Sequence, residues 1–454
     1  MKIFLAKLLR SVLPLVALIL VACGGGGASS GGSGIPPATY TIGGNISGLS
    51  NGAQVTLDNS GANPLTTSNG AFTFTTPLAY NGNYAVTVGI QPTGQTCNVV
   101  NGTGTVGAAN VTNVQVNCGA LFAVYVANLG GGVSAYTIGV GTGTLTPVAG
   151  SPFAAGTGPQ SVTVDPSGTF AYVANFGNNI SAYTIGVGTG ALTPVAGSPF
   201  TAGSYPYSVT VDPSGAFTYV ANTNGSNVSA YTINATTGVL TPVAGSPFAA
   251  GSNPQSVTID PSGKFAYVAN YYGNSISAYT ITAITGALTQ MAGSPFVAGT
   301  NPTSITVDPS GKFAYATNNG GGVSAYTINA TTGSLTPMSG SPFAAGTNPI
   351  SITVNPSGTF AYVANNGSNN VSAYTINATT GVLTPLAGTP FAAGTSPTSV
   401  TTDPSGAFAY VANNGSNNVS AYTINVTTGV LTPLAGSPFA TGSNPQSVTV
   451  RQIK

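Results

Sequence analysis

Histidine, glutamate and tryptophan are absent from this sequence, so its six acidic residues are all aspartates. Histidine is the side chain most often used as a general base near neutral pH, and it is also the commonest metal ligand. The composition therefore excludes sites that depend on histidine or glutamate. We expect no metal site, no cofactor and no catalytic residue of the usual acid–base kind.

Charge of either sign is also scarce, since charged residues make up 3% of the chain, against about 25% in a typical globular protein. Three of the seven basic residues lie in the first 22 positions. The remainder of the chain holds four basic residues against six aspartates, a net charge of −2. Without a basic patch, nucleic acid is not an expected partner.

Glycine, proline and small polar residues are abundant, with 63 Gly and 32 Pro. Disordered chains combine such residues with low hydrophobicity, but 42% of this chain is hydrophobic. The apolar residues recur in short alternating runs, and a period of two is typical of β-strands. The sequence therefore predicts an all-β protein.

The N-terminal segment, residues 1–22, has a basic start, an apolar run and small residues at its end, as a secretory signal peptide does. Its ending, LVA before Cys23, resembles the bacterial lipobox, in which the cysteine is acylated and becomes the new N-terminus. The resemblance implies a lipoprotein signal peptide, lipidation at Cys23 and a membrane contact through the lipid. The alternative is a plain signal peptide followed by an incidental cysteine.

Residues 23–38 are rich in glycine, serine and proline and predict a flexible tether between lipid and folded protein. In enteric bacteria, an aspartate after the lipidated cysteine retains a lipoprotein at the inner membrane. Gly24 stands at that position here. We therefore expect an exported lipoprotein of the cell envelope, attached to the outer membrane.

Residues 39–118 read as about seven short alternating strands separated by turn signals, which predicts a small immunoglobulin-like β-sandwich. Cys97 and Cys118 are the other two cysteines of the chain. An exported protein meets an oxidising compartment, so we expect them to form a disulfide. A redox pair or a metal pair is the alternative.

A repeat fills residues 119–454, with a tyrosine in each copy of the phrase YVAN or its variants. The period of 47 or 48 residues and the strand-like content predict the blades of a β-propeller. Each copy contains four strand patterns, of the types SVTV, FAYVAN, VSAYTI and LTP, and a crossover of the type AGSPFAAGTNP that is too rich in Gly and Pro for a strand. The marker tyrosines are Tyr125, Tyr172, Tyr219, Tyr267, Tyr315, Tyr362 and Tyr410.

The strand patterns are offset along the chain. The first copy begins at residue 120 with its second strand, and an unaccompanied inner strand, SVTV, stands at residues 447–450. Pairing the two completes a seventh blade and removes the open edges of a linear array. The sequence thus predicts a seven-bladed β-propeller closed by the C-terminal strand.

Two repeated residue types have structural explanations. Five aspartates precede Pro-Ser-Gly, with Asn355 in a sixth copy, and an Asp or Asn there accepts backbone hydrogen bonds and starts a turn. One phenylalanine occurs in every crossover, and we expect it to be buried between neighbouring blades.

The phrase NPxSVTVDPSGxFAYVANxGSNNVSAYTI, followed by TTGxLTPxxGSPF, resembles the bacterial lactonase-like seven-bladed propeller family, whose enzymes include 6-phosphogluconolactonases. The segment before it looks like the small β-domains that often precede such propellers in bacterial lipoproteins. The resemblance implies hydrolysis of sugar lactones. Enzymes of that family carry Arg-His before the inner strand and a nearby Glu, whereas the matching positions here hold neither.

These pre-strand positions vary most among the repeats, and we expect them to surround the mouth of the central channel. Uncharged amides and one tyrosine suit a neutral polar ligand such as a sugar, although unselected variation gives the same pattern. The candidate ligand-binding residues are Gln160, Tyr207, Gln255, Thr303, Ile350, Thr398 and Gln446.

Two functions follow from these observations. The first is a lipid-anchored, non-catalytic propeller that binds or scaffolds a glycan, a peptide or an envelope protein. The alternative is a lactonase-like hydrolase of sugar lactones, of the 6-phosphogluconolactonase type, with an unconventional or degenerate site. A mainly structural role of near-identical repeats is a third interpretation.

Overall fold

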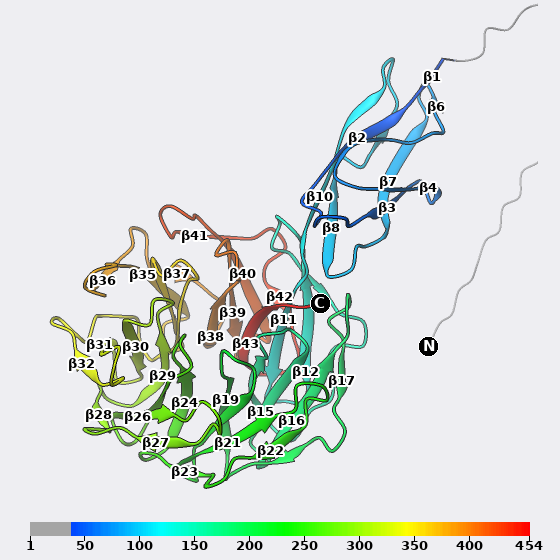
Figure 1. The fold of residues 1–454 in the computed structure, drawn as a ribbon. Coiled ribbons are helices and arrows are strands. Elements are labelled where there is room, and N and C mark those ends of the chain that lie inside the picture. The colour runs from blue at the N-terminus through cyan, green and yellow to red at the C-terminus, as the bar shows by residue number, and fades with distance from the viewer. Residues whose placement is uncertain (1–37) are drawn as a thin grey trace, which may run out of the picture.

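The computed structural model describes residues 38–454 and shows a small strand-rich unit joined to a ring of seven blades (Figure 1). Within this range no helix is long and apolar enough to cross a membrane. The predicted signal peptide at residues 1–22, the lipidation site Cys23 and nearly all of the tether at residues 23–38 lie outside the described residues. They stay predictions.

The N-terminal unit is a sandwich of two four-stranded sheets, with orders β5-β2-β10-β8 and β4-β3-β7-β9, and a short β1-β6 ribbon. It has ten strands, more than the seven expected, and β10 runs parallel to β2. Apolar side chains from both sheets form one core. The strands are β1 (Thr39–Tyr40), β2 (Ile42–Ser47), β3 (Val55–Asn59), β4 (Ala62–Thr67), β5 (Gly70–Thr73), β6 (Leu78–Ala79), β7 (Asn83–Ile90), β8 (Gln95–Val100), β9 (Thr103–Thr105) and β10 (Val111–Ala120).

Cys97 on β8 and Cys118 on β10 form a disulfide, as predicted, between directly paired positions of neighbouring strands. Strand β10 ends at Ala120, and only Leu121 separates it from the first strand of the propeller. The Leu121 N–H donates to the Gly94 carbonyl oxygen of the sandwich (3.2 Å). The connection between the two units is therefore short.

Each blade is an antiparallel sheet whose inner strand lines the axis of the ring. In blades 1 to 7 the inner strands are β43 (Pro445–Gln452), β14 (Pro159–Val164), β19 (Pro206–Val211), β24 (Pro254–Ile259), β29 (Pro302–Val307), β33 (Pro349–Val354) and β38 (Pro397–Thr402). The second strands are β11 (Phe122–Asn128), β15 (Phe170–Asn175), β20 (Phe217–Asn222), β25 (Phe265–Asn270), β30 (Phe313–Asn318), β34 (Phe360–Asn365) and β39 (Phe408–Asn413).

The outer half of each blade is shorter. The third strands are β12 (Val133–Ile138), β16 (Asn179–Ile185), β21 (Asn227–Ile233), β26 (Ser275–Ile281), β31 (Val323–Ile328), β35 (Asn370–Ile376) and β40 (Asn418–Ile424). The fourth strands are β13 (Leu145–Pro147), β17 (Leu192–Pro194), β22 (Leu240–Pro242), β27 (Leu288–Gln290), β32 (Leu335–Pro337), β36 (Leu383–Pro385) and β41 (Leu431–Pro433).

The ring closes as the offset of the repeats predicted. Strand β43 pairs antiparallel with β11, with Val448 opposite Val126 and Val450 opposite Val124. Blade 1 therefore takes its inner strand from the C-terminal repeat and its other three strands from the first repeat. The fold is an all-β, seven-bladed propeller.

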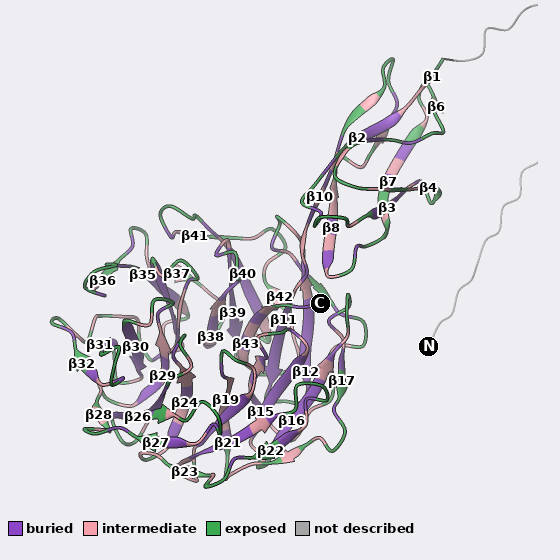
Figure 2. Ribbon diagram, in the orientation of Figure 1, coloured by how far each residue is buried: buried purple, intermediate pink, exposed green. Residues whose placement is uncertain are grey.

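Seven apolar clusters hold the ring together, one at each contact between neighbouring blades. Figure 2 shows the buried residues concentrated in the blade strands. The FAYVAN strands are buried along their whole length because both faces are covered by adjacent blades. Their tyrosines also bridge blades: the Tyr172 hydroxyl donates to Gly238 O (3.1 Å), and the Tyr410 hydroxyl donates to Gly143 O (2.8 Å) across the closure.

The crossovers differ from the prediction in two respects. In five of them a two-residue strand pairs with the third strand of the blade, because the three-residue fourth strand leaves the start of the third strand uncovered. The crossover phenylalanines pack against the interblade clusters but are half-buried, since one side of each ring faces the surface. These strands are β18 (Phe200–Thr201), β23 (Phe248–Ala249), β28 (Phe296–Val297), β37 (Phe391–Ala392) and β42 (Phe439–Ala440).

Candidate functional site

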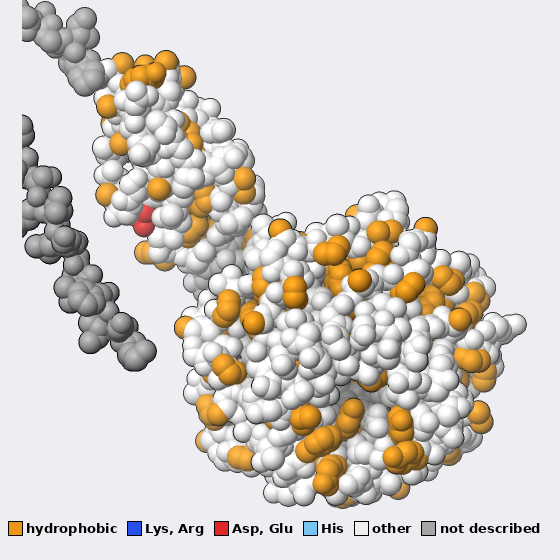
Figure 3. Space-filling view, turned by 180° about the vertical axis from the view of Figure 1, so that it is seen from behind, with side chains coloured by type: hydrophobic (Ala, Val, Ile, Leu, Met, Phe, Trp, Pro, Cys, Tyr) orange, Lys and Arg blue, Asp and Glu red, His pale blue; other side chains and the backbone are white. Residues whose placement is uncertain are grey.

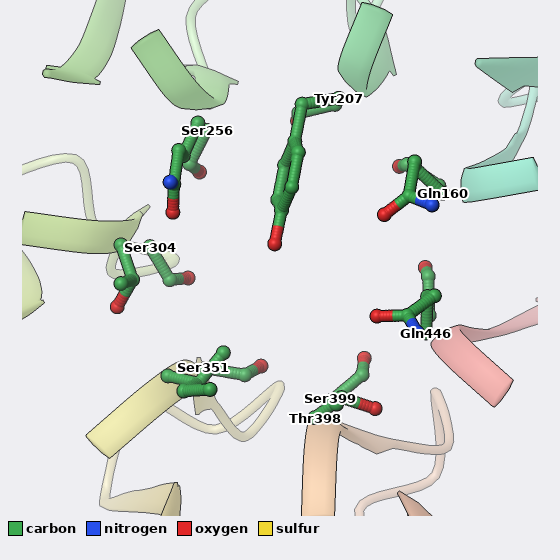
Figure 4. Close-up of a pocket in the computed structure, with 14 residues that line it drawn as sticks. Gln160, Tyr207, Ser256, Ser304, Ser351, Thr398, Ser399 and Gln446 are labelled. Atoms are coloured by element: carbon green, nitrogen blue, oxygen red, sulfur yellow. The ribbon is translucent and has the colours of Figure 1, made fainter. Parts of the chain in front are cut away.

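A pocket of about 180 Å³ lies on the axis of the propeller, where the inner strands begin. All seven residues predicted at the channel mouth line it, and each is joined by the serine that follows it in sequence (Figure 4). The structure thus brings together every predicted binding position, although ligand binding itself stays a prediction. The added serines are Ser161, Ser208, Ser256, Ser304, Ser351, Ser399 and Ser447.

A β-bulge in every blade explains why two consecutive side chains face the same pocket. In blade 2, Pro159 pairs with Asn175 and Ser161 pairs with Ala174, so Gln160 has no partner of its own. The same shift occurs at the start of all seven inner strands. Consecutive residues of a regular strand point to opposite faces, and a bulge re-aims one of them.

The serines form a hydrogen-bonded ring around the axis. In six of the seven cases the serine hydroxyl oxygen accepts the backbone N–H of the next inner strand, as between Ser399 and Val448 (3.1 Å) or Ser256 and Ile305 (3.2 Å). Accepting that bond leaves the hydroxyl hydrogen free to donate. The ring therefore presents hydrogen-bond donors to whatever occupies the pocket.

The glutamines are held so that their oxygens remain available. The amide nitrogens of Gln255 and Gln446 donate to Asn253 Oδ1 (3.2 Å) and Asn444 O (3.4 Å). Figure 4 shows the side-chain oxygens of Gln160 and Gln446 directed toward the centre of the pocket. These oxygens are acceptors that complement the serine donors.

Two threonines and an isoleucine form further parts of the pocket wall. Thr398 and Thr303 donate to proline carbonyl oxygens of the next blade, Pro445 (2.9 Å) and Pro349 (3.2 Å). Their hydroxyls therefore have partners within the protein. Ile350 contributes apolar surface. The pocket is consequently more polar on the glutamine side than at Ile350.

Tyr207 is the only titratable side chain that lines the pocket, and Figure 4 shows its hydroxyl directed toward the centre. Burial raises the pKa of this hydroxyl above its ordinary value, and the nearby Tyr271 raises that pKa further. A tyrosine with a raised pKa stays protonated at neutral pH. Tyr207 is therefore a hydrogen-bond donor and not a base or a nucleophile.

The charged residues of the propeller lie at the other end of the inner strands. Asp165 follows β14 and accepts backbone N–H groups from Thr169 (2.8 Å) and Phe170 (2.7 Å), which confirms the predicted turn. Asn355 makes the same bonds in blade 6. Arg451 donates to Pro166 O (3.0 Å) at this end of the channel. Within residues 38–454, no group of three His, Cys, Asp or Glu side chains could hold a metal ion.

The serine ring was missed by the sequence reasoning, which treated variable positions as the source of specificity. The available signal was the serine at the third position of every inner strand, which is the same in all seven repeats. In a regular strand, this serine and the variable residue before it would point to opposite faces of the blade. Only the bulge places both in the pocket.

The chain matches a family model described as "Lactonase, 7-bladed beta-propeller" at residues 146–254, 244–348 and 338–449. A candidate 6-phosphogluconolactonase from Bacteroides fragilis is 22% identical with a TM-score of 0.65, over 73% of this chain and 98% of that chain. A second from Bacteroides uniformis is 20% identical with a TM-score of 0.65, over 73% and 99%.

The periplasmic gluconolactonase of Pseudomonas aeruginosa is 18% identical with a TM-score of 0.61, over 74% of this chain and 100% of that chain. At identities this low, the likeness to these solved structures concerns the fold. No curated protein sequence matches the chain.

Proposed function

The chain belongs to the lactonase family of seven-bladed β-propellers, and we propose that its axial pocket binds sugar lactones and hydrolyses them through hydrogen bonding alone. The observation that carries this proposal is the convergence of Tyr207 and the serine hydroxyls on one pocket at the family's channel mouth. The solved structures with the same fold include a gluconolactonase, which agrees with this substrate class.

Lactone hydrolysis needs little from the protein beyond binding of the lactone and hydrogen-bond donors for its carbonyl oxygen. Water attacks the lactone carbonyl carbon, and the carbonyl oxygen becomes an oxyanion that Tyr207 and the serines can hold. The ring C–O bond then breaks, the ring oxygen takes up a proton from solvent, the attacking water loses one to solvent, and a hydroxy acid leaves. Oxyanion stabilisation and binding without a general base retain roughly 10³–10⁴-fold acceleration in well-studied hydrolases. We expect the protein to accelerate lactone hydrolysis by a factor in that range.

The second candidate is the non-catalytic binding module. It is favoured by the composition of the pocket lining, which contains no Asp, Lys or Arg and whose one titratable group, Tyr207, stays protonated. The same amides and hydroxyls that would hold a lactone would hold an unreactive sugar. Turnover distinguishes the two candidates, because only the first consumes the ligand.

Hydrolysis of D-glucono-1,5-lactone by the purified protein should exceed the rate in buffer. Replacing Tyr207 with Phe removes one donor while keeping the ring, and should lower kcat by on the order of 10–100-fold with little change in KM. The 6-phosphorylated lactone should not be preferred, since no cation lines the pocket. A pH-stat assay with both lactones measures these effects.

Tyr80→Phe is the matched control, because Tyr80 lies exposed on the sandwich, and it should leave the rate unchanged.

The acceleration over buffer should also stay constant between about pH 5 and pH 8. The raised pKa of Tyr207 keeps the donating form populated there, and donation is lost only above the ordinary tyrosine pKa of about 10. Rates equal to buffer throughout would rule out hydrolysis and leave the binding module.

For its location, we propose that the protein is exported and anchored in the envelope by lipid on Cys23. The basic and apolar residues 1–22 and the lipobox-like LVA before Cys23 support this. Incorporation of labelled palmitate that is lost in a Cys23→Ser variant is the corresponding measurement, and a protein without label would contradict the anchor.

A further inference from the structure

Five aromatic side chains gather on one side of the channel mouth, in blades 2 to 4. The Phe176 ring lies 5.4 Å from Tyr205 and 6.0 Å from Tyr207, and the Tyr271 and Tyr272 rings are 5.0 Å apart. Tyr207 belongs to the pocket, so the group continues from the pocket outward. We call Phe176, Tyr205, Tyr207, Tyr271 and Tyr272 the aromatic arc.

The arc is not explained by packing of the fold. Tyr272 is 67% exposed and Tyr205 is 45% exposed, whereas the repeated tyrosines of the blades are buried. The side across the mouth, in blades 5 to 7, carries amides at the positions that correspond to Phe176 and Tyr271, namely Asn319, Asn366 and Asn414. The seven blades therefore share one backbone fold, but the side chains around the channel mouth differ between blades 2 to 4 and blades 5 to 7.

Tyr205 is held in a backbone conformation that tyrosine disfavours. Its φ is +55°, in the left-handed region, where the side chain of a bulky residue meets its own backbone. The equivalent positions of the other blades carry Gly158, Asn253, Asn301, Asn348, Ser396 and Asn444, all of which are small. A bulky residue kept at a strained position next to a pocket points to a use at the surface.

From this geometry we infer that the aromatic arc is a platform for the sugar rings of a neutral oligosaccharide that extends out of the axial pocket. The C–H faces of sugar rings pack on the electron-rich faces of aromatic rings, and tyrosine adds a hydroxyl at the edge. The amides across the mouth supply donors and acceptors for the sugar hydroxyls. This inference deepens the proposed function, on which it rests for the position of the reacting sugar.

The surroundings favour a neutral saccharide over an acidic one or an apolar protein segment. No Lys or Arg lines the pocket, and Figure 3 shows a propeller face on which no charged side chain is coloured. The arc is mixed with hydroxyls and amides, so an apolar segment would leave these groups without partners. Rigid tyrosines give large contact areas at a low entropic cost.

Binding of neutral trisaccharides tests this inference. Maltotriose, cellotriose and triacetylchitotriose are titrated into the full-length protein by isothermal calorimetry, beside glucose and the acidic trigalacturonate. At least one neutral trisaccharide should bind roughly tenfold more tightly than glucose, because added rings contact the arc. Trigalacturonate should show no such gain.

The decisive variants replace two tyrosines of the aromatic arc with the residues that other blades carry at the equivalent positions. Tyr205→Asn copies Asn253 and removes the strain, and Tyr272→Asn copies Asn224 of blade 3, so neither should harm folding. Together they should lower trisaccharide affinity by roughly tenfold or more. Tyr80→Asn, which removes an exposed tyrosine of the sandwich, serves as the control and should change nothing.

The inference is overturned if no neutral trisaccharide binds better than glucose, or if the Tyr205→Asn/Tyr272→Asn protein binds as tightly as the unchanged one. Hydrolysis of D-glucono-1,5-lactone by the unchanged protein is measured alongside. Turnover without a gain for trisaccharides would refute the arc and leave the proposed function intact. Trisaccharide binding without turnover would refute the proposed hydrolysis and leave the aromatic arc as a binding platform.

Discussion

Removal of residues 445–454 should abolish the cooperative unfolding of the propeller. The deletion takes away β43 and with it the pairing that closes blade 1. It also removes Val448 and Val450 from the contact between blades 7 and 1 and Ile453 from the contact between blades 1 and 2. Each such side chain is worth about 1.5–3 kcal/mol, so the loss is a large part of a total stability of about 5–15 kcal/mol.

Urea unfolding followed by circular dichroism, with size-exclusion chromatography, measures this effect. The exposed edges of β11 and the neighbouring inner strands should also promote association between chains. A synthetic peptide of residues 445–454 should restore a sharp transition. Arg451→Ala is the control, because it removes one hydrogen bond to Pro166 O and should melt close to the unchanged protein. A truncated monomer with an unchanged midpoint would refute closure by β43.

Gly286→Ala should destabilise the propeller by about 2–5 kcal/mol. Gly286 lies in the turn between β26 and β27 with φ +72°, and an added Cβ would lie 2.3 Å from the Phe217 ring of the preceding blade. Its carbonyl oxygen accepts the Tyr219 hydroxyl (2.9 Å). The substitution therefore combines backbone strain with displacement of a buried ring at an interblade contact, and urea unfolding measures the change.

Gly141→Ala separates the two causes. Gly141 has nearly the same φ, +70°, but an added Cβ there meets nothing within 4 Å. It should cost only the strain of a left-handed alanine, about 1 kcal/mol. Equal losses at the two positions would mean that contact with Phe217 contributes nothing.

Several features of the site followed from the sequence because the repeats could be aligned. Aligning the seven copies shows which positions keep the same kind of residue because the blade needs it, such as the Asp or Asn of the turn. It also shows which positions vary from copy to copy. The seven variable positions from Gln160 to Gln446 were identified in this way, and they do surround one pocket. Their common location follows from the symmetry of a closed ring.

Other features could not be read from the repeats. The bulge that lets both Gln160 and Ser161 face the pocket depends on how Pro159 and Ser161 pair with β15. No residue of the repeated phrase predicts it. The half-burial of the crossover phenylalanines depends on how far neighbouring blades approach. The aromatic arc joins residues of three blades, and Phe176 and Tyr205 meet only when those blades are side by side.

By itself, the sequence determined the all-β class, the number of blades, the closing strand and the disulfide, because period, alternation and cysteine count are local or additive properties of the chain. The tertiary structure alone decided which polar groups meet at the axis, which of them have free hydrogens or lone pairs, and where aromatic rings stay exposed. The reason is physical: hydrogen-bond satisfaction and burial depend on neighbours that come from other blades, and a one-residue shift in pairing changes the face to which a side chain points.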